Sequence, residues 1–135
     1  MSRENVEIVR AAWDAWERKD MDALFGFYDP EIVWDQTHYP AGELTAVYSG
    51  HDGVRRFFRE WLAPFESYWA QAEEIIDAGE AVLVRCRQGG RGKRSRAEVD
   101  MPVYWQVYRL RDGRVVRIEV YVDDREGLEA AGLAK

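Results

Sequence analysis

The sequence has few of the residues that form disulfides or hold metals. Of its 135 residues only Cys86 is a cysteine, and only His38 and His51 are histidines. A lone cysteine excludes a disulfide within the chain, and no Cys/His cluster has metal-ligand spacing. Neither a phosphate-binding loop nor a dinucleotide-binding fingerprint is present, so the sequence implies no cofactor and no metal.

Long apolar runs and a surplus of basic charge are also missing. No segment approaches the roughly 20 apolar residues that a membrane helix needs. Residues 1–7 lack the apolar core of a signal peptide, which makes a cytoplasmic protein the default expectation. A formal net charge of -6 argues against nucleic acid or an anionic membrane as a partner.

Aromatic residues, by contrast, are plentiful. Six Trp, seven Tyr and five Phe stand in a chain that is 47% hydrophobic. That much buriable surface predicts a folded core, and the length is too short for two domains. We therefore expect one domain over residues 1–135.

The first half of the chain has helical periodicity. Apolar residues three and four apart predict a helix from Ser2, and Asp20 is suited to cap a second, short helix. A third helix is expected before Pro64. The expected elements are the helix from Ser2, a helix over residues 21–28, a strand over 31–36, a loop over 37–43 and a helix over 49–62.

After Pro64 the hydrophobic pattern alternates, which predicts strands joined by short turns. Short connections favour antiparallel neighbours. The expected fold is α+β: a curved antiparallel or mixed sheet, wrapped by three N-terminal helices into a cone, as in a cystatin-like α+β barrel. The expected strands span residues 66–77, 80–88, 96–110 and 114–123.

Alternation along these strands sorts side chains between the two faces of the sheet. If Gln106 faces the inside of the cone, then Asp100, Tyr104 and Tyr108 do so too. Trp105 then lies on the outer face.

The outer face is expected to be strongly apolar. It carries Trp105, Tyr121, Val103 and Val107. Such a face predicts a homodimer that pairs sheet against sheet. Arg85 is also expected on the outside, because the apolar residues that alternate with it point inward.

Four short motifs resemble the SnoaL-like branch of a cone-shaped superfamily. They are Asp20-Met-Asp-Ala-Leu, the aspartate that ends Glu-Ile-Val-Trp-Asp, Ser-Gly-His-Asp-Gly-Val, and Arg-Asp-Gly-Arg-Val-Val. The superfamily includes ketosteroid isomerase, limonene epoxide hydrolase, scytalone dehydratase and nuclear transport factor two. The resemblance spans nearly the whole chain and implies the fold rather than one reaction.

Asp35 is the first catalytic candidate. It ends an apolar strand beside Trp34, where desolvation would raise its pKa toward that of a general base. The resemblance implies that it corresponds to the proton-shuttling aspartate of ketosteroid isomerase. A solvated or hydrogen-bonded carboxylate at the strand end is the alternative. That enzyme's oxyanion-hole residues correspond to Ala12 and Gln106, of which only Gln106 can donate, so a standard ketosteroid isomerase is not expected.

Limonene epoxide hydrolase resembles the last forty residues, including Tyr121-Val-Asp123. Its water-activating aspartate corresponds to Val120, and its arginine-x-aspartate pair to Arg85-Cys86-Arg87. Without either carboxylate, that reaction is not expected.

Other polar residues each have a simpler structural role as an alternative. His38 titrates near neutrality and the Tyr39 phenol can donate a hydrogen bond, although a solvated loop histidine also fits. Asp100 either lines the cavity or pairs with an arginine across the hairpin. The catalytic candidates are Asp35, Gln106 and Tyr104, and the candidate ligand-binding residues are Trp34, His38, Tyr39, Trp61, Asp100, Tyr108, Ile118 and Val120.

Three function classes stay open. One is a cofactor-independent isomerase, cyclase, dehydratase or hydrolase in which Asp35 moves a proton while Gln106, Tyr104 or Tyr39 holds an oxygen. The second is a non-catalytic binder of a small hydrophobic or oxygenated molecule. The third is a dimerisation domain whose cone is plugged by its own aromatics, with Trp13, Trp16, Phe57 and Trp61 more typical of core than of a ligand cage. The substrate depends on cavity shape, which the sequence leaves open.

Overall fold

Three helices lie where the periodicity predicts them. A fourth helix follows near the C-terminus. The computed structural model describes residues 2–133, and none of the helices in that part of the chain is long and apolar enough to cross a membrane. Asp20 caps the second helix by accepting a hydrogen bond from the backbone N–H of Ala23 at 3.1 Å. The helices are α1 (Ser2–Glu17), α2 (Met21–Gly26), α3 (Gly50–Leu62) and α4 (Asp124–Ala130), with a short 3-10 turn at Gly42–Leu44.

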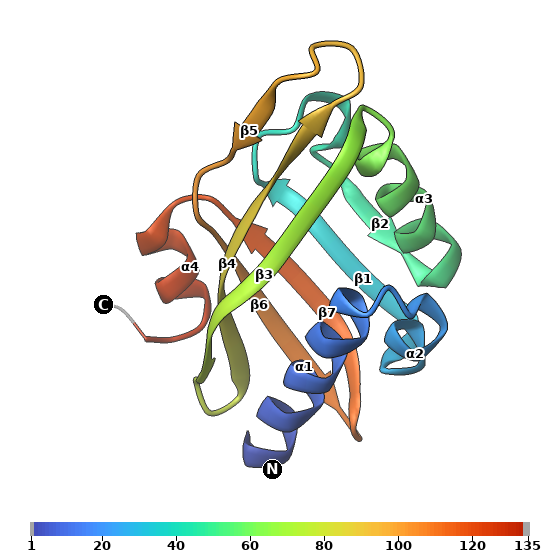
Figure 1. Cartoon of the computed structure of the whole chain (residues 1–135). Coiled ribbons are helices and arrows are strands. Elements are labelled where there is room, and N and C mark those ends of the chain that lie inside the picture. The colour runs from blue at the N-terminus through green and yellow to red at the C-terminus, as the bar shows by residue number, and fades with distance from the viewer. Residues whose placement is uncertain (1, 134–135) are drawn as a thin grey trace.

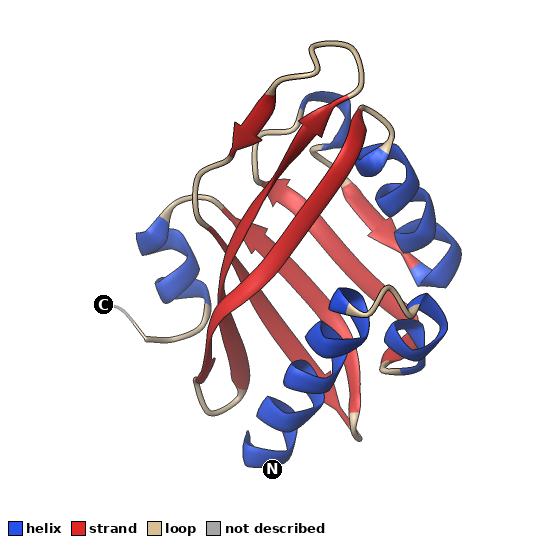
Figure 2. Ribbon diagram, viewed as in Figure 1, coloured by secondary structure: helices blue, strands red, loops and turns tan. Residues whose placement is uncertain are grey.

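The strands form one curved sheet in the order β2-β1-β7-β6-β4-β3, with β5 paired to β4 (Figures 1 and 2). All neighbours are antiparallel except β1 and β7, which run parallel. The strands are β1 (Tyr28–His38), β2 (Val47–Ser49), β3 (Phe65–Asp77), β4 (Ala81–Gly92), β5 (Glu98–Asp100), β6 (Tyr104–Arg111) and β7 (Arg114–Tyr121).

The helices divide between the two faces of the sheet. Figure 1 shows α1, α2 and α3 over the concave side and α4 against the outside of β6 and β7. Two separate clusters of buried apolar residues result. The larger fills the cone beneath α1, α2 and α3, and the smaller lies beneath α4. The α+β cone is thereby confirmed.

Glycines explain why β4 runs further than predicted. Residues 89–92 lie beyond the expected strand over 80–88, yet they belong to β4. A Cβ on Gly90 would lie 2.3 Å from the Ser67 carbonyl oxygen, and one on Gly89 2.6 Å from that of Val99. Glycine is therefore required here by the close approach of neighbouring strands.

Proline explains why the expected strand over residues 96–110 is broken. β5 ends at Asp100 and β6 begins at Tyr104, with Pro102 between them. Proline has no N–H to donate to a sheet ladder, so it separates the two strands.

The helix α4 was not predicted, and it changes the outer face of the sheet. Trp105 is 6% exposed and Tyr121 7% exposed in the single chain. Trp105 Nε1 donates to Asp124 Oδ1 at 2.6 Å, and Gly127 packs so closely that a Cβ there would lie 3.0 Å from the Trp105 Cβ. The premise of an open apolar outer face was therefore wrong, because α4 covers it.

Candidate functional site

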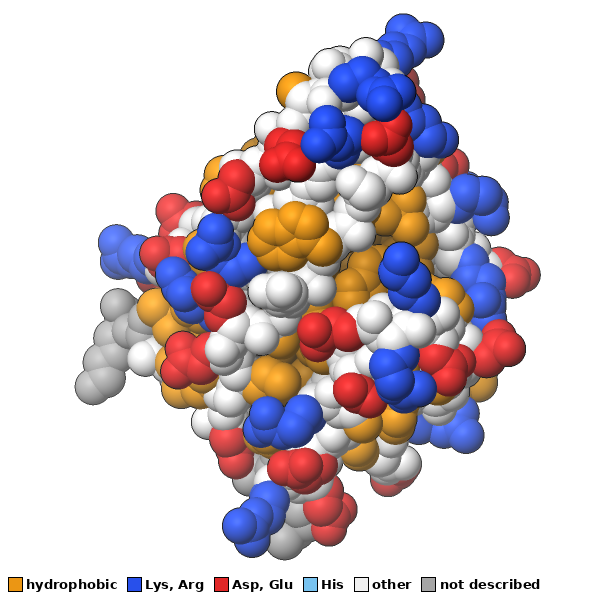
Figure 3. Space-filling model, in the orientation of Figure 1, with side chains coloured by type: hydrophobic (Ala, Val, Ile, Leu, Met, Phe, Trp, Pro, Cys, Tyr) orange, Lys and Arg blue, Asp and Glu red, His pale blue; other side chains and the backbone are white. Residues whose placement is uncertain are grey.

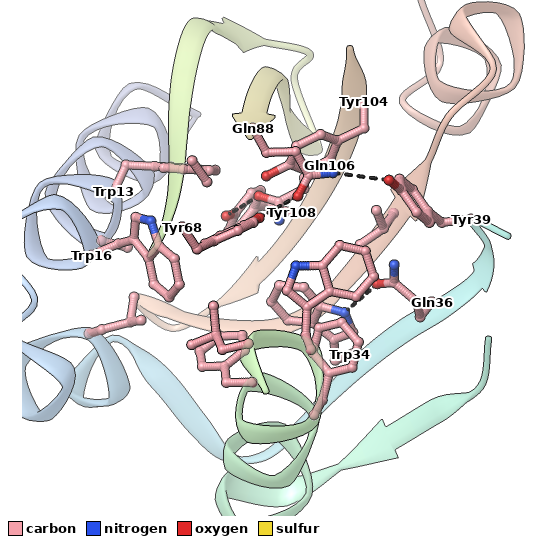
Figure 4. Close-up of a pocket in the computed structure, with 18 of the residues that line it drawn as sticks. Trp13, Trp16, Trp34, Gln36, Tyr39, Tyr68, Gln88, Tyr104, Gln106 and Tyr108 are labelled. Atoms are coloured by element: carbon pink, nitrogen blue, oxygen red, sulfur yellow. Dashed lines mark hydrogen bonds between the residues drawn. The ribbon is translucent and has the colours of Figure 1, made fainter. Parts of the chain in front are cut away.

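A cavity of about 70 Å³ lies between the concave face of the sheet and the helices α1, α2 and α3. Figure 4 shows its side chains converging from both layers. Aromatic rings make up most of its wall. They are Trp13, Trp16, Tyr28, Trp34, Tyr39, Phe57, Phe58, Trp61, Tyr68, Tyr104 and Tyr108.

These rings hold each other in place through edge and tilted contacts. The Trp34 and Phe57 rings are 5.2 Å apart between centroids, and Phe57 is 5.9 Å from Trp61. Tyr39 meets Trp61 edge-on at 5.7 Å. Such contacts add to the burial energy of each ring and keep the wall rigid.

Three buried glutamines supply amide groups to the cavity (Figure 4). Gln36 Oε1 accepts a hydrogen bond from Trp34 Nε1 at 2.8 Å. Gln106 Oε1 accepts one from the Tyr108 hydroxyl at 2.5 Å.

The third glutamine, Gln88, joins two phenols. Its Oε1 accepts from the Tyr68 hydroxyl, and its Nε2 donates to the Tyr39 hydroxyl at 3.0 Å. Gln88 is 2% exposed, so its amide has exchanged water for these partners.

The cavity carries no full charge at neutral pH. Within residues 2–133, none of the residues that line it is Asp, Glu, His, Lys or Arg. Burial raises the pKa of Tyr68, Tyr104 and Tyr108. Their phenols therefore stay protonated, and they can donate a hydrogen bond but do not serve as bases. The described residues include no group of three or more His, Cys, Asp or Glu that could hold a metal ion.

The cavity brings together most of the predicted site residues but not all of them. Asp35, His38, Asp100 and Ile118 lie outside its wall. The predicted residues that line it are Gln106, Tyr104, Trp34, Tyr39, Trp61, Tyr108 and Val120.

Asp35 lies on the other face of β1. Trp34 and Gln36 line the cavity, so the side chain between them points to the opposite side of the sheet. Asp35 Oδ2 is 2.7 Å from Arg117 Nη2, and Oδ1 accepts hydrogen bonds from the hydroxyl of Thr37 at 2.6 Å and its backbone N–H at 2.9 Å.

These contacts lower the pKa of Asp35. Burial alone would raise it, but the two hydrogen bonds from Thr37 and the nearby positive charge of Arg117 outweigh burial. The prediction of a raised pKa was wrong, and the alternative of a hydrogen-bonded strand-end carboxylate is confirmed.

Asp35 belongs to a network of ion pairs on the outer face. Arg117 Nε is 2.8 Å from Glu119 Oε2, and Arg109 Nε is 3.1 Å from the same oxygen. Burial would raise the pKa of Glu119, but these two arginines more than offset that effect and lower it. His38 lies on the same face, with its ring stacked on Tyr121 at 4.7 Å.

The other two outlying candidates have structural surroundings. Asp100 is exposed on β5 and pairs with Arg87 at 3.4 Å, as the alternative interpretation held. Ile118 is fully buried in the core beneath the cavity wall. Arg85 faces outward as predicted and pairs with Glu73 at 2.5 Å.

Sequence reasoning missed some of the cavity's polar groups. Gln88 follows Cys86 at the spacing that places both on the inner face, so alternation alone could have found it. Gln36 shares its face with Trp34 by the same rule. Trp13 and Trp16 were interpreted as core; they pack in the core and also line the cavity.

A family model described as a SnoaL-like domain matches residues 9–118. No curated protein matches the chain.

Three solved structures illustrate the shared fold. One is an NTF2-like protein of unknown function from Burkholderia pseudomallei, with 23% identity, 93% of this chain and 95% of that chain covered, and a TM-score of 0.76. A second is TerC co-crystallized with polyporic acid, with 19% identity, coverages of 96% and 98%, and a TM-score of 0.75. A third is a candidate polyketide cyclase from Sinorhizobium meliloti, with 26% identity, coverages of 84% and 93%, and a TM-score of 0.65.

Proposed function

The chain belongs to the SnoaL-like domain family, and from this premise we propose that it binds a small, uncharged organic molecule in the aromatic cavity. The observation that supports the proposal is that the cavity wall is aromatic and uncharged. Rings from α1, α3 and the sheet surround the space, and its polar atoms are neutral amides, phenols and indoles. Apolar walls with a few placed polar groups are typical of small-molecule sites.

The size of the cavity limits what can enter it. At about 70 Å³ it is about half the volume of an engineered cavity of roughly 150 Å³ that holds benzene. A molecule larger than the cavity would therefore extend out of it.

An open groove of about 550 Å³ adjoins the cavity and provides that room. Trp16, Leu62, Tyr68 and Ala70 line both spaces. Figure 3 shows a hollow with hydrophobic side chains on its floor on this side of the molecule. A ligand would bury one end among the aromatic rings and leave the other end in the groove. TerC, which shares this fold, was co-crystallized with polyporic acid, which is consistent with a small-molecule site in such a fold.

The proposal gives no catalytic part to Asp35. A general base must reach the proton that it removes, and Asp35 is turned away from the cavity toward Arg117. Should the bound molecule react, the Gln106 amide N–H and the Tyr104 hydroxyl are the groups that could hold its oxygen.

A change that fills the cavity tests the proposal. Ala12 lines the cavity and is 2% exposed, so Ala12→Leu would occupy the ligand's space. Ala11→Leu adds the same atoms beside it on α1, outside the cavity wall. We expect cyclopentanone or its hydrocarbon analogue methylenecyclopentane to shift the Trp signals of the parent protein and of Ala11→Leu in NMR titrations, but not those of Ala12→Leu. Melting temperatures confirm that each variant is folded. Equal binding by both variants, or no binding of either compound to the parent protein, contradicts the proposal.

The homodimer stays a prediction. Since α4 already covers much of the outer sheet face, a dimer there would have to form around α4 and the ion pairs of Arg109 and Arg117. Light scattering after size-exclusion chromatography at micromolar concentration measures it directly, and a monomer contradicts it.

A further inference from the structure

Resting on the proposed function of the cavity, we infer that the ligand carries a hydrogen-bond-accepting oxygen, as in a ketone, and that the indole N–H of Trp13 binds this oxygen.

Trp13 Nε1 is buried and makes no hydrogen bond of standard geometry among the described residues, although it lies close enough to the Tyr108 hydroxyl to offset part of the rise in the pKa of Tyr108. Trp13 is 7% exposed and lines the cavity, and Figure 4 shows its ring projecting from α1 toward the side of the cavity that holds Tyr108. Buried donors are nearly always paired in native proteins, because an unpaired one has lost its water without compensation. An acceptor from a bound molecule would supply the missing partner.

The amide oxygens around the cavity are already engaged. Gln36 accepts from Trp34, Gln106 from Tyr108 and Gln88 from Tyr68. An indole N–H can donate a hydrogen bond but cannot accept one. The side-chain atom of Gln36 that is bonded to Trp34 Nε1 must therefore be the amide oxygen. The NH2 group of Gln36 is thereby left as a donor. Together with Trp13, it makes the remaining polar surface of the cavity rich in donors.

Charge narrows the ligand class further. Within residues 2–133, no cation lines the cavity to offset a buried carboxylate, and no anion lines it to offset a buried ammonium group. A neutral carbonyl compound satisfies the free donor without this desolvation cost.

The test compares two ligands of the same shape. Cyclopentanone and methylenecyclopentane differ in having C=O or C=CH2 at one position, so steric limits affect both alike. In ¹H–¹⁵N spectra the six Trp residues give six indole signals, and Trp13→Phe assigns that of Trp13 by its loss. We expect cyclopentanone to move the Trp13 indole proton downfield, the direction of hydrogen-bond formation, and methylenecyclopentane not to do so. The Trp34 indole, already bonded to Gln36, serves as an internal reference.

Variant affinities give a second, independent readout. Trp13→Phe keeps an aromatic ring but removes the N–H, and we expect it to lower the preference for ketone over hydrocarbon about tenfold, since one hydrogen bond is worth about that factor. Trp16→Phe, also on α1 and on the cavity wall, is the matched control and should weaken both ligands equally.

The outcomes separate this inference from the proposal beneath it. If both ligands bind and the Trp13 indole signal responds to them alike, the cavity binds small molecules but the assignment of an acceptor is overturned. If neither ligand binds, the proposed function fails, and this inference fails with it. The spectra of the unmodified protein decide the question even if Trp13→Phe does not fold.

Discussion

At the scale of single residues, the two neighbours Trp34 and Asp35 show how the candidate site was partly mispredicted. Both were expected at the cavity, but successive side chains of a strand point to opposite faces. Trp34 lines the cavity, and Asp35 is ion-paired on the outside. To choose between them from sequence, one must know which face of the strand points into the cavity. The neighbouring strands in the sheet decide this.

The surroundings of Asp35 predict a structural role that depends on pH. Its folded-state pKa lies below its unfolded-state value. Its charge therefore stabilises the fold at neutral pH, and this contribution is lost as the pH falls through the folded-state pKa. We expect Asp35→Asn to lower the free energy of unfolding by about 1 kcal/mol at pH 7, with the difference shrinking in acid, and to leave ligand binding unchanged.

Urea unfolding at pH 7 and in acid measures this effect. Asp100→Asn is the control, because Asp100 is exposed and its contact with Arg87 is long, so we expect a change within about 0.5 kcal/mol. Loss of ligand binding in Asp35→Asn without loss of stability contradicts the structural role and restores Asp35 as a catalytic candidate.

At the scale of elements, the helices were easier to predict than the ends of the strands. A 3.6-residue period and the cap at Asp20 act locally, and α1, α2 and α3 lie where those signals indicate. The limits of β4 depend instead on residues 67 and 99, whose backbones approach Gly90 and Gly89. No local signal reports such an approach, so the strand was expected to end at residue 88.

The close approach at Gly90 gives a sharp prediction. A Cβ there would overlap a backbone oxygen of β3, so Gly90→Ala requires the two strands to separate. We expect it to lower the free energy of unfolding by about 2 kcal/mol or more.

Gly26→Ala is the matched control for this substitution. Gly26 ends α2, with nothing within 4 Å of an added Cβ, so the change should be neutral or stabilising. Chemical denaturation of both variants checks the pair, and equal stability of the two contradicts the steric account.

At the scale of the whole molecule, α4 decides what the outer face presents. Two hydrogen bonds hold it in place: Trp105 Nε1 donates to Asp124, and Arg109 Nη2 donates to the Ala130 carbonyl at 3.0 Å. Ala131 adds apolar contacts. These contacts bury an outer cluster that would otherwise be exposed.

Removal of α4 is therefore expected to change association. A chain that ends at Asp123 exposes Trp105, Val107 and Leu83, and we expect it to form larger species or aggregates at concentrations where the full chain does not. A chain that ends at Gly132 retains α4 and serves as the control. Light scattering compares the three chains, and identical masses contradict the covering role of α4.

The sequence by itself determined the α+β class, the three N-terminal helices and the inward series Tyr104, Gln106 and Tyr108. These follow from local periods and caps, which act over a few residues and are written along the chain. Only the tertiary structure decided that Asp35 faces Arg117, that Gln88 joins the phenols of Tyr39 and Tyr68, and that α4 closes the outer face. Each of these depends on which distant segments become neighbours, and a contact between segments 80 residues apart leaves no periodic signal in either of them.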